Sequence, residues 1–145
     1  MTDIELTTSI TIDAPATSVW EALTTPELIK QWFFGVDTET DWEVGSSLVH
    51  CGEWQGEPYE DKGTILTFDP PKTLMHSHWS PASGVPDQPE NYELVTWNLA
   101  ELDGWTELTI YETNLASVQA KQVSEEGWKA SLSNLKELLE RTTRS

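Results

Sequence analysis

The chain has 145 residues and a mass of 16.3 kDa, which fits a single domain over residues 1–145 with a core of its own. It carries 25 Asp and Glu against 8 Lys and Arg, and its net charge of −17 argues against nucleic acid or an anionic membrane as a partner. A single cysteine, Cys51, rules out an intramolecular disulfide, and no apolar run is long enough to cross a membrane. The acidic, alternating N-terminus is unlike a leader peptide, so we expect a cytoplasmic protein.

The acidic residues are unevenly spread, because residues 1–60 hold 12 of them and only one base, Lys30. Solubility is the ordinary role of such surface charge, and a basic protein partner or a salty habitat is the alternative. Against this acidic background the chain has eight tryptophans. Each joins a large apolar ring to one N–H donor, which suits cores, pockets and interfaces.

The N-terminal part predicts a strand followed by two short helices. Apolar residues alternate over residues 4–12, which is the pattern of a half-buried strand. From Thr17 the apolar residues recur at helical spacing until Thr24. Pro26 then starts a second short helix, which we expect to run over residues 27–33 and to end before Gly35.

The middle of the chain predicts consecutive strands joined by short turns, and therefore a mostly antiparallel sheet. The expected strands cover residues 38–42, 48–54, 63–68, 74–79, 92–101 and 105–111. A proline-rich loop over residues 80–89 separates the fourth strand of this series from the fifth. Asp103-Gly104 between the last two strands is a strong hairpin signal.

The C-terminal part predicts one long helix. Trp128, Leu132, Leu135 and Leu139 form a single apolar stripe, and Ser124 is the expected cap at its start. The order of elements is strand, two helices, a long meander and one helix, which indicates the α+β class. The helix needs a broad apolar face on which to lie, and the sheet is the face available.

Several motifs in the same order resemble those of a known family. They are the segments Pro15–Phe33, Gly63–Leu74 and Gly127–Leu135, together with His76–Pro81 (H-S-H-W-S-P) and Pro89–Tyr92 (P-E-N-Y). The chain thereby resembles, over almost its whole length, the START-related family named after the activator of heat-shock-protein-90 ATPase, in the SRPBCC superfamily.

This resemblance implies the helix-grip fold, in which a curved antiparallel sheet wraps around the C-terminal helix and leaves a cavity between them. Relatives in the superfamily bind lipids, sterols, polyketides or plant hormones, and some catalyse cyclisation or hydrolysis. The eukaryotic activator stimulates its chaperone with the help of a second domain, for which this chain has no residues. Chaperone activation therefore does not carry over directly, because a fold fixes function only loosely.

The chain lacks the common signatures of catalytic and nucleotide-binding sites, including G-x-x-x-x-G-K-[ST], G-x-S-x-G, H-E-x-x-H and C-x-x-C. From the alternation of residues along a strand, we expect the side chains of Glu53 and Glu93 to point outward. No pair of carboxylates suggests a general acid and a general base. We therefore expect no catalytic residue and no cofactor. An enzyme acting on a polyketide-like substrate stays open only through superfamily analogy.

The three histidines have three interpretations. His76 and His78 lie two residues apart, so they share a strand face with Leu74, which resembles an inward position of the family. The plainest interpretation is that these two histidines and His50 are hydrogen-bonded within a core of mixed polar and apolar residues. Polar groups of a ligand pocket are the second. A zinc site of three imidazoles is the third, and because no carboxylate spacing reinforces it we expect no metal.

The leading hypothesis is a small-molecule-binding protein that holds an apolar or aromatic ligand, such as a lipid, polyketide or flavonoid, between sheet and helix. A chaperone-linked or stress-related protein-interaction module is the alternative, and the protein is expected to be a monomer or a weak homodimer. The residues expected to bind the ligand are Trp32, Phe33, His50, Trp54, His76, His78, Tyr92, Trp97, Trp128 and Leu132.

Overall fold

The computed structural model describes residues 2–143, apart from the side chains of residues 54, 82, 142 and 143. Its elements follow one another in the order that the sequence predicts. They are β1 (Leu6–Ile12), α1 (Ala16–Thr24), α2 (Pro26–Trp32), β2 (Asp37–Glu39), β3 (Ser47–Trp54), β4 (Glu57–Asp69), β5 (Thr73–His78), two 3₁₀ turns (Pro81–Ser83 and Pro89–Asn91), β6 (Glu93–Leu102), β7 (Trp105–Thr113) and α3 (Val118–Thr143).

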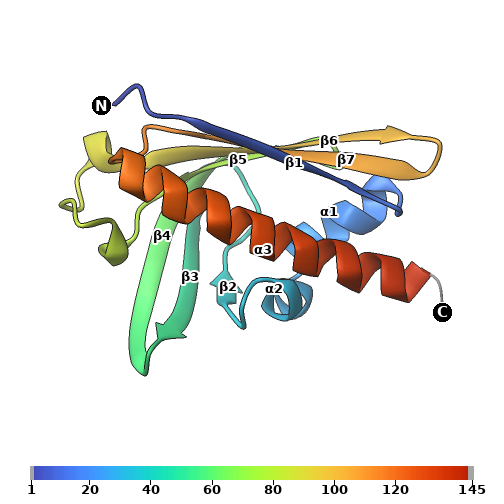
Figure 1. Ribbon diagram of the computed structural model, residues 1–145, viewed down its shortest axis with the longest axis horizontal. Coiled ribbons are helices and arrows are strands. Elements are labelled where there is room, and N and C mark those ends of the chain that lie inside the picture. The colour runs from blue at the N-terminus through green and yellow to red at the C-terminus, as the bar shows by residue number, and fades with distance from the viewer. Residues whose placement is uncertain (1, 144–145) are drawn as a thin grey trace.

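The seven strands form one antiparallel sheet in the order β1-β7-β6-β5-β4-β3-β2. Figure 1 shows α3 running alongside β1, β6 and β7, with β3 and β4 passing behind its N-terminal half and α1 and α2 beside its C-terminal half. This is a curved sheet gripping a long C-terminal helix. The prediction of an α+β helix-grip fold is confirmed.

The core lies between the sheet and α3, as the predicted stripe requires. Leu132, Leu135 and Leu139 are buried, and Trp128 packs against the same cluster from a partly buried position. The sheet contributes alternate residues such as Val95 from β6, because only one strand face points at the helix.

The helix α3 begins at Val118, almost two turns before the Ser124 cap that the sequence predicts. Ser117 accepts a hydrogen bond from the backbone N–H of Ala120 at 3.0 Å and so takes the capping role. The added turns lack an apolar stripe, since Val118 and Val123 are exposed. Helical periodicity in the sequence therefore does not reveal these turns.

β4 and β2 differ from their expected ranges for reasons that the structure shows. β4 starts at Glu57 rather than at residue 63, because residues 57–62 pair with β3 although their sequence is mostly polar. β2 ends at Glu39, and Trp42, which was expected to continue it, has a φ of 58° that no strand can contain. The Asp103-Gly104 hairpin is confirmed, with φ values of 54° and 85° at these two residues.

β4 and β5 approach each other closely at Gly63. A Cβ atom at this position would overlap the carbonyl oxygen of Ser77 on β5, so no other residue fits without moving a strand. The neighbouring Thr64 donates its backbone N–H to the Ser77 hydroxyl at 2.9 Å. This contact sets the spacing of the two strands that carry Asp61 and His78.

Candidate functional site

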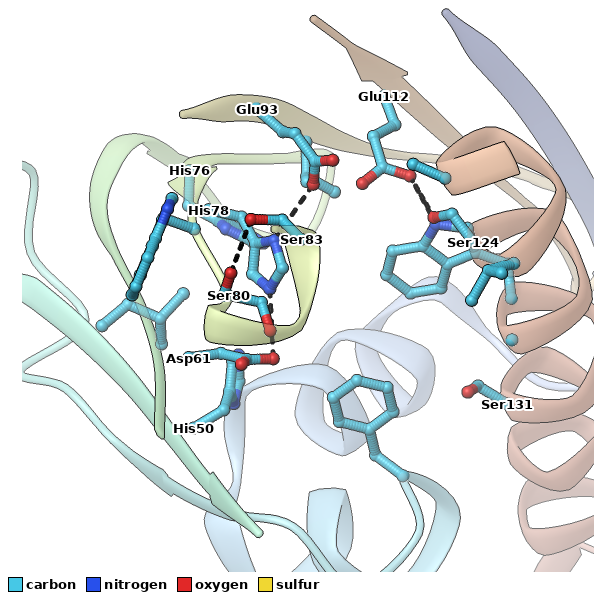
Figure 2. A pocket seen from close by; sticks show the side chains of 18 of the residues that line it. His50, Asp61, His76, His78, Ser80, Ser83, Glu93, Glu112, Ser124 and Ser131 are labelled. Atoms are coloured by element: carbon cyan, nitrogen blue, oxygen red, sulfur yellow. Dashed lines mark hydrogen bonds and ion pairs between the residues drawn. The ribbon is translucent and has the colours of Figure 1, made fainter. Parts of the chain in front are cut away.

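A pocket of about 540 Å³ lies between the inner face of the sheet and the N-terminal half of α3. Figure 2 shows strand residues along one side of it and residues of α3 on the other. Phe34 and Val123 border the pocket and are 61% and 72% exposed, so the pocket opens to solvent beside them. Among the described residues, its aromatic lining consists of Trp32, Phe33, Phe34, Trp42, Trp79, Trp97 and Trp128.

The aromatic rings hold one another in place. Trp97 on β6 meets Trp128 on α3 edge to face, with ring centroids 5.1 Å apart, and it meets Trp32 in the same way at 6.2 Å. Phe33 stacks on Trp128 with an interplanar angle of 9°. Because these residues come from α2, β6 and α3, the rings join all three elements around the pocket.

His76 is a neutral, buried histidine whose two ring nitrogens are both engaged. Its Nδ1 donates to the Ser77 carbonyl at 2.9 Å, and its Nε2 accepts the indole N–H of Trp97 at 3.1 Å. Burial lowers the pKa of His76 to about 3, so the ring carries no charge at neutral pH. It fixes the orientation of Trp97.

His50 is neutral for the same reason. Burial, and then the charge of His78, lower its pKa to about 4. Its Nδ1 pairs with the Thr38 hydroxyl at 3.0 Å, and the ring of Phe33 lies against it at 5.7 Å. His50 thus joins β3 to the short strand β2 at one wall of the pocket.

His78 is the charged histidine of the pocket. Burial alone would lower its pKa, but its hydrogen bonds to Asp61 and Glu93 and their charges raise the pKa to about 10. Its Nε2 donates to Asp61 at 3.3 Å and its Nδ1 donates to Glu93 at 3.1 Å. The expectation that Glu93 points outward is wrong, because Glu93 shares the inward face of β6 with Val95 and Trp97.

Glu112 on β7 is a buried carboxylate that faces this group. It accepts the Ser124 hydroxyl at 2.5 Å and the indole N–H of Trp128 at 3.0 Å, both on the same oxygen, Oε1. Burial and the adjacent Glu93 raise its pKa to about 7, in spite of these two donors. Glu112 therefore changes charge near neutral pH.

Most of the residues expected to bind a ligand line the pocket: Trp32, Phe33, His50, His76, His78, Trp97 and Trp128. Tyr92 lies outside it, where it lines a second pocket of about 530 Å³ and donates its hydroxyl to Asp87 at 2.6 Å. Leu132 is in the core behind the pocket. The side chain of Trp54 is outside the part of the chain that the structure describes.

The geometry does not bring three imidazoles together as a metal site. Among the described residues, the potential ligand atoms that converge belong to His78, Glu93 and Glu112, which lie within 4.8 Å of one another. Sequence reasoning missed Asp61, Glu93 and Glu112. For Glu93 the signal was present, because it alternates with Val95 and Trp97 along its strand.

Within residues 2–143, none of the helices combines the length and the hydropathy that crossing a bilayer would require.

Comparison with known proteins identifies the family. The family model described as Activator of Hsp90 ATPase homolog 1-like protein matches residues 13–140. A search of curated proteins gave no match.

Solved structures agree with the family model. ChR145 from Cytophaga hutchinsonii is 40% identical, with a TM-score of 0.82 over 99% of this chain and 98% of its own. CalU16 from Micromonospora echinospora is 27% identical, with a TM-score of 0.71 over 90% of this chain and 73% of its own. MLL2253 from Mesorhizobium loti shares the fold, with 23% identity and a TM-score of 0.80 over 96% of this chain and 98% of its own. The resemblance found in the sequence is therefore confirmed, and the chain belongs to the Activator of Hsp90 ATPase homolog 1-like family.

Proposed function

We propose that the protein binds a small apolar or aromatic molecule in the pocket between its sheet and α3. The observation that carries this proposal is the composition of the pocket wall, which joins five tryptophans and two phenylalanines to one group of polar side chains. Small-molecule sites typically combine apolar walls with a few placed polar groups in this way.

The volume of the pocket supports the same function. About 540 Å³ falls within the range of roughly 300–1,000 Å³ that is typical of ligand sites. The aromatic walls are held by contacts to one another and to His76, so the pocket needs little ordering when a ligand enters. Such preorganisation favours binding of a flat, rigid compound.

Indole N–H signals offer a direct test, because each tryptophan reports its own position. A titration of the ¹⁵N-labelled protein with 2-naphthol should shift the signals of Trp97 and Trp128. The exposed Trp105, at the tip of the β6–β7 hairpin, serves as the internal control and should not shift. Shifts confined to tryptophans outside the pocket, or no binder among flat aromatic compounds, would contradict the proposal.

A pair of variants sharpens this test. Phe33→Ala removes a ring that stacks on Trp128, and it should weaken binding about tenfold or more. Tyr92→Ala removes a ring outside the pocket and should leave the affinity unchanged. Thermal melting of both variants establishes that each is folded before binding is compared.

Catalysis on the bound molecule is the second candidate function. It is favoured by the convergence of His78 with two carboxylates inside the pocket, since paired acids and bases are the usual groups for proton transfer. Mass spectrometry of a bound compound after prolonged incubation distinguishes the two candidates. A compound recovered unchanged indicates binding alone, and a product that does not form with His78→Gln indicates an enzyme.

A further inference from the structure

The charged side chains of the pocket are mostly of one sign. Asp61, Glu93 and Glu112 all line it, and among the lining residues that the structure describes there is no Lys or Arg. Of these described lining residues, His78 is the one that holds a positive charge, and its two N–H donors are already shared between Asp61 and Glu93. The pocket therefore offers carboxylates to its ligand and lacks a free cation with which to hold an anion.

From this arrangement we infer that the pocket selects organic cations. The ligand is an aromatic or apolar molecule with a protonated amine, which lies at Glu93 and Glu112 while its apolar body lies among the tryptophans. This inference rests on the proposed function and names its ligand class. It excludes carboxylates and phosphates, including fatty acids, because an anion would enter next to three acidic groups.

The geometry of the acidic end suits an ammonium group. The ligating atoms of Glu93, Glu112 and His78 lie within 4.8 Å of one another, so one small cation between the carboxylates would contact both. Figure 2 shows the side chains of Glu93 and Glu112 extending into the same space from adjacent strands. Two charged acceptors around one N–H donor group make strong hydrogen bonds, particularly where water is scarce.

The aromatic walls suit the same cation. Trp128 donates its indole N–H to Glu112, which holds the indole ring directly beside the carboxylates. Trp97 packs on Trp128 from the sheet side. Because the N–H edge of Trp128 points at Glu112, an amine held by this carboxylate would place its apolar body along the neighbouring rings.

Two buried polar atoms give independent evidence that a ligand with polar groups belongs here. The hydroxyl of Ser131 on α3 is fully buried and has no hydrogen-bond partner among the described residues, and Figure 2 shows it pointing into the pocket. The Oδ1 atom of Asp61, which also lines the pocket, is buried and likewise has no partner in that part of the chain. Buried polar groups are nearly always paired, so a ligand with polar groups would supply partners that these two atoms lack.

A metal ion fits these residues less well than an amine. Both ring nitrogens of His78 face carboxylates within 3.3 Å, which requires both to donate and leaves no lone pair for a metal. Seven aromatic rings in the lining also favour an organic ligand over a small hydrated ion.

Three probes with one ring system test the inference. They are 2-(1-naphthyl)ethylamine, 2-(1-naphthyl)ethanol and 1-naphthylacetate, which differ in the charge of a single group. Calorimetric titration at about pH 8 keeps the amine protonated and Glu112 ionised, since the pKa of this carboxyl is about 7. The amine should bind about tenfold or more tightly than the alcohol, and the acetate should bind most weakly.

Two Glu→Gln variants on the same strand separate the pocket charge from the net charge of the protein. Glu112→Gln keeps an oxygen that accepts from Ser124 and Trp128, and it should weaken binding of the amine about tenfold while changing the alcohol less than about twofold. Glu107→Gln removes the same charge from the exposed face of β7 and should leave all three affinities unchanged.

The outcomes distinguish this inference from the proposed function. Equal affinities for the three probes would overturn the selection of cations and leave the proposed function standing. No binding of any probe would overturn both. Zn²⁺ or Mn²⁺ binding that displaces the amine and is lost in His78→Gln would make the acidic end a metal site, and would also overturn the inference.

Discussion

Replacing Glu112 by Gln should stabilise the protein above neutral pH. Glu112 is 3% exposed and lies beside Glu93, so burial and the neighbouring charge raise its pKa from 4.5 to about 7. A carboxyl whose pKa is raised by folding contributes its full stabilisation of the native state below its unfolded pKa. That contribution is lost as the pH rises from about 4.5 to about 7, because the folded state must then hold a charge that it disfavours.

The size of the effect follows from the same shift. Each tenfold change in a protonation equilibrium corresponds to about 1.4 kcal/mol, so the ionised Glu112 costs about 3 kcal/mol of folding free energy. Gln has nearly the same shape and keeps an acceptor for Ser124 and Trp128. We therefore expect Glu112→Gln to raise the free energy of unfolding by about 2–3 kcal/mol near pH 8.5, and by less than about 1 kcal/mol near pH 5.

Urea denaturation followed by far-ultraviolet circular dichroism measures both values, provided that the m-value stays constant. Glu107→Gln is the control, because it removes an exposed carboxylate from the outer face of the same strand. A Glu112→Gln variant that is no more stable than the parent near pH 8.5 would refute the reasoning. So would a gain of the same size at both pH values, which would point to packing rather than to ionisation.

Three further predictions concern the stability of the fold. Leu132→Ala, at a position only 2% exposed, should lower the free energy of unfolding by about 2–5 kcal/mol in urea, and a loss below about 0.5 kcal/mol would show that the stripe is not core. Ser131→Ala should leave the free protein equally stable or more stable by about 1 kcal/mol, because it removes a buried hydroxyl without a partner among the described residues; a clear loss would reveal a hydrogen bond at this position. The melting temperature should rise as NaCl shortens the Debye length from about 10 Å to about 3 Å, since residues 1–60 have only Lys30 to balance 12 acids; a flat curve in differential scanning calorimetry would mean that these acids are compensated locally.

The fold could be predicted from the sequence because its elements have strong local patterns. Alternation over residues 4–12, the Asp103-Gly104 turn and the stripe ending at Leu139 each depend on neighbouring residues in the chain. The first turns of α3 and the first half of β4 lack such patterns. They are set by tertiary pairing, which overrides local preference.

The site was only half predictable for a similar reason. The histidines and tryptophans stood out by residue type, and strand alternation placed His76, His78 and Trp97 on the inward face. Acidic residues did not stand out, because in a chain with 25 of them a carboxylate is normally assigned to the surface. Glu112 lies just beyond the expected end of its strand, and Asp61 just before the expected start of its own.

The close approach of β4 and β5 at Gly63 has a consequence for redesign of the pocket. The aromatic wall consists of side chains, so exchanging Phe33 or Trp128 for smaller residues would reshape the space while the backbone stays where it is. The distance between Asp61 and His78, in contrast, depends on two backbones that touch because one residue has no side chain. Libraries for new ligands should therefore vary the rings and keep Gly63 fixed, since a single methyl group there would push apart the strands that carry this pair.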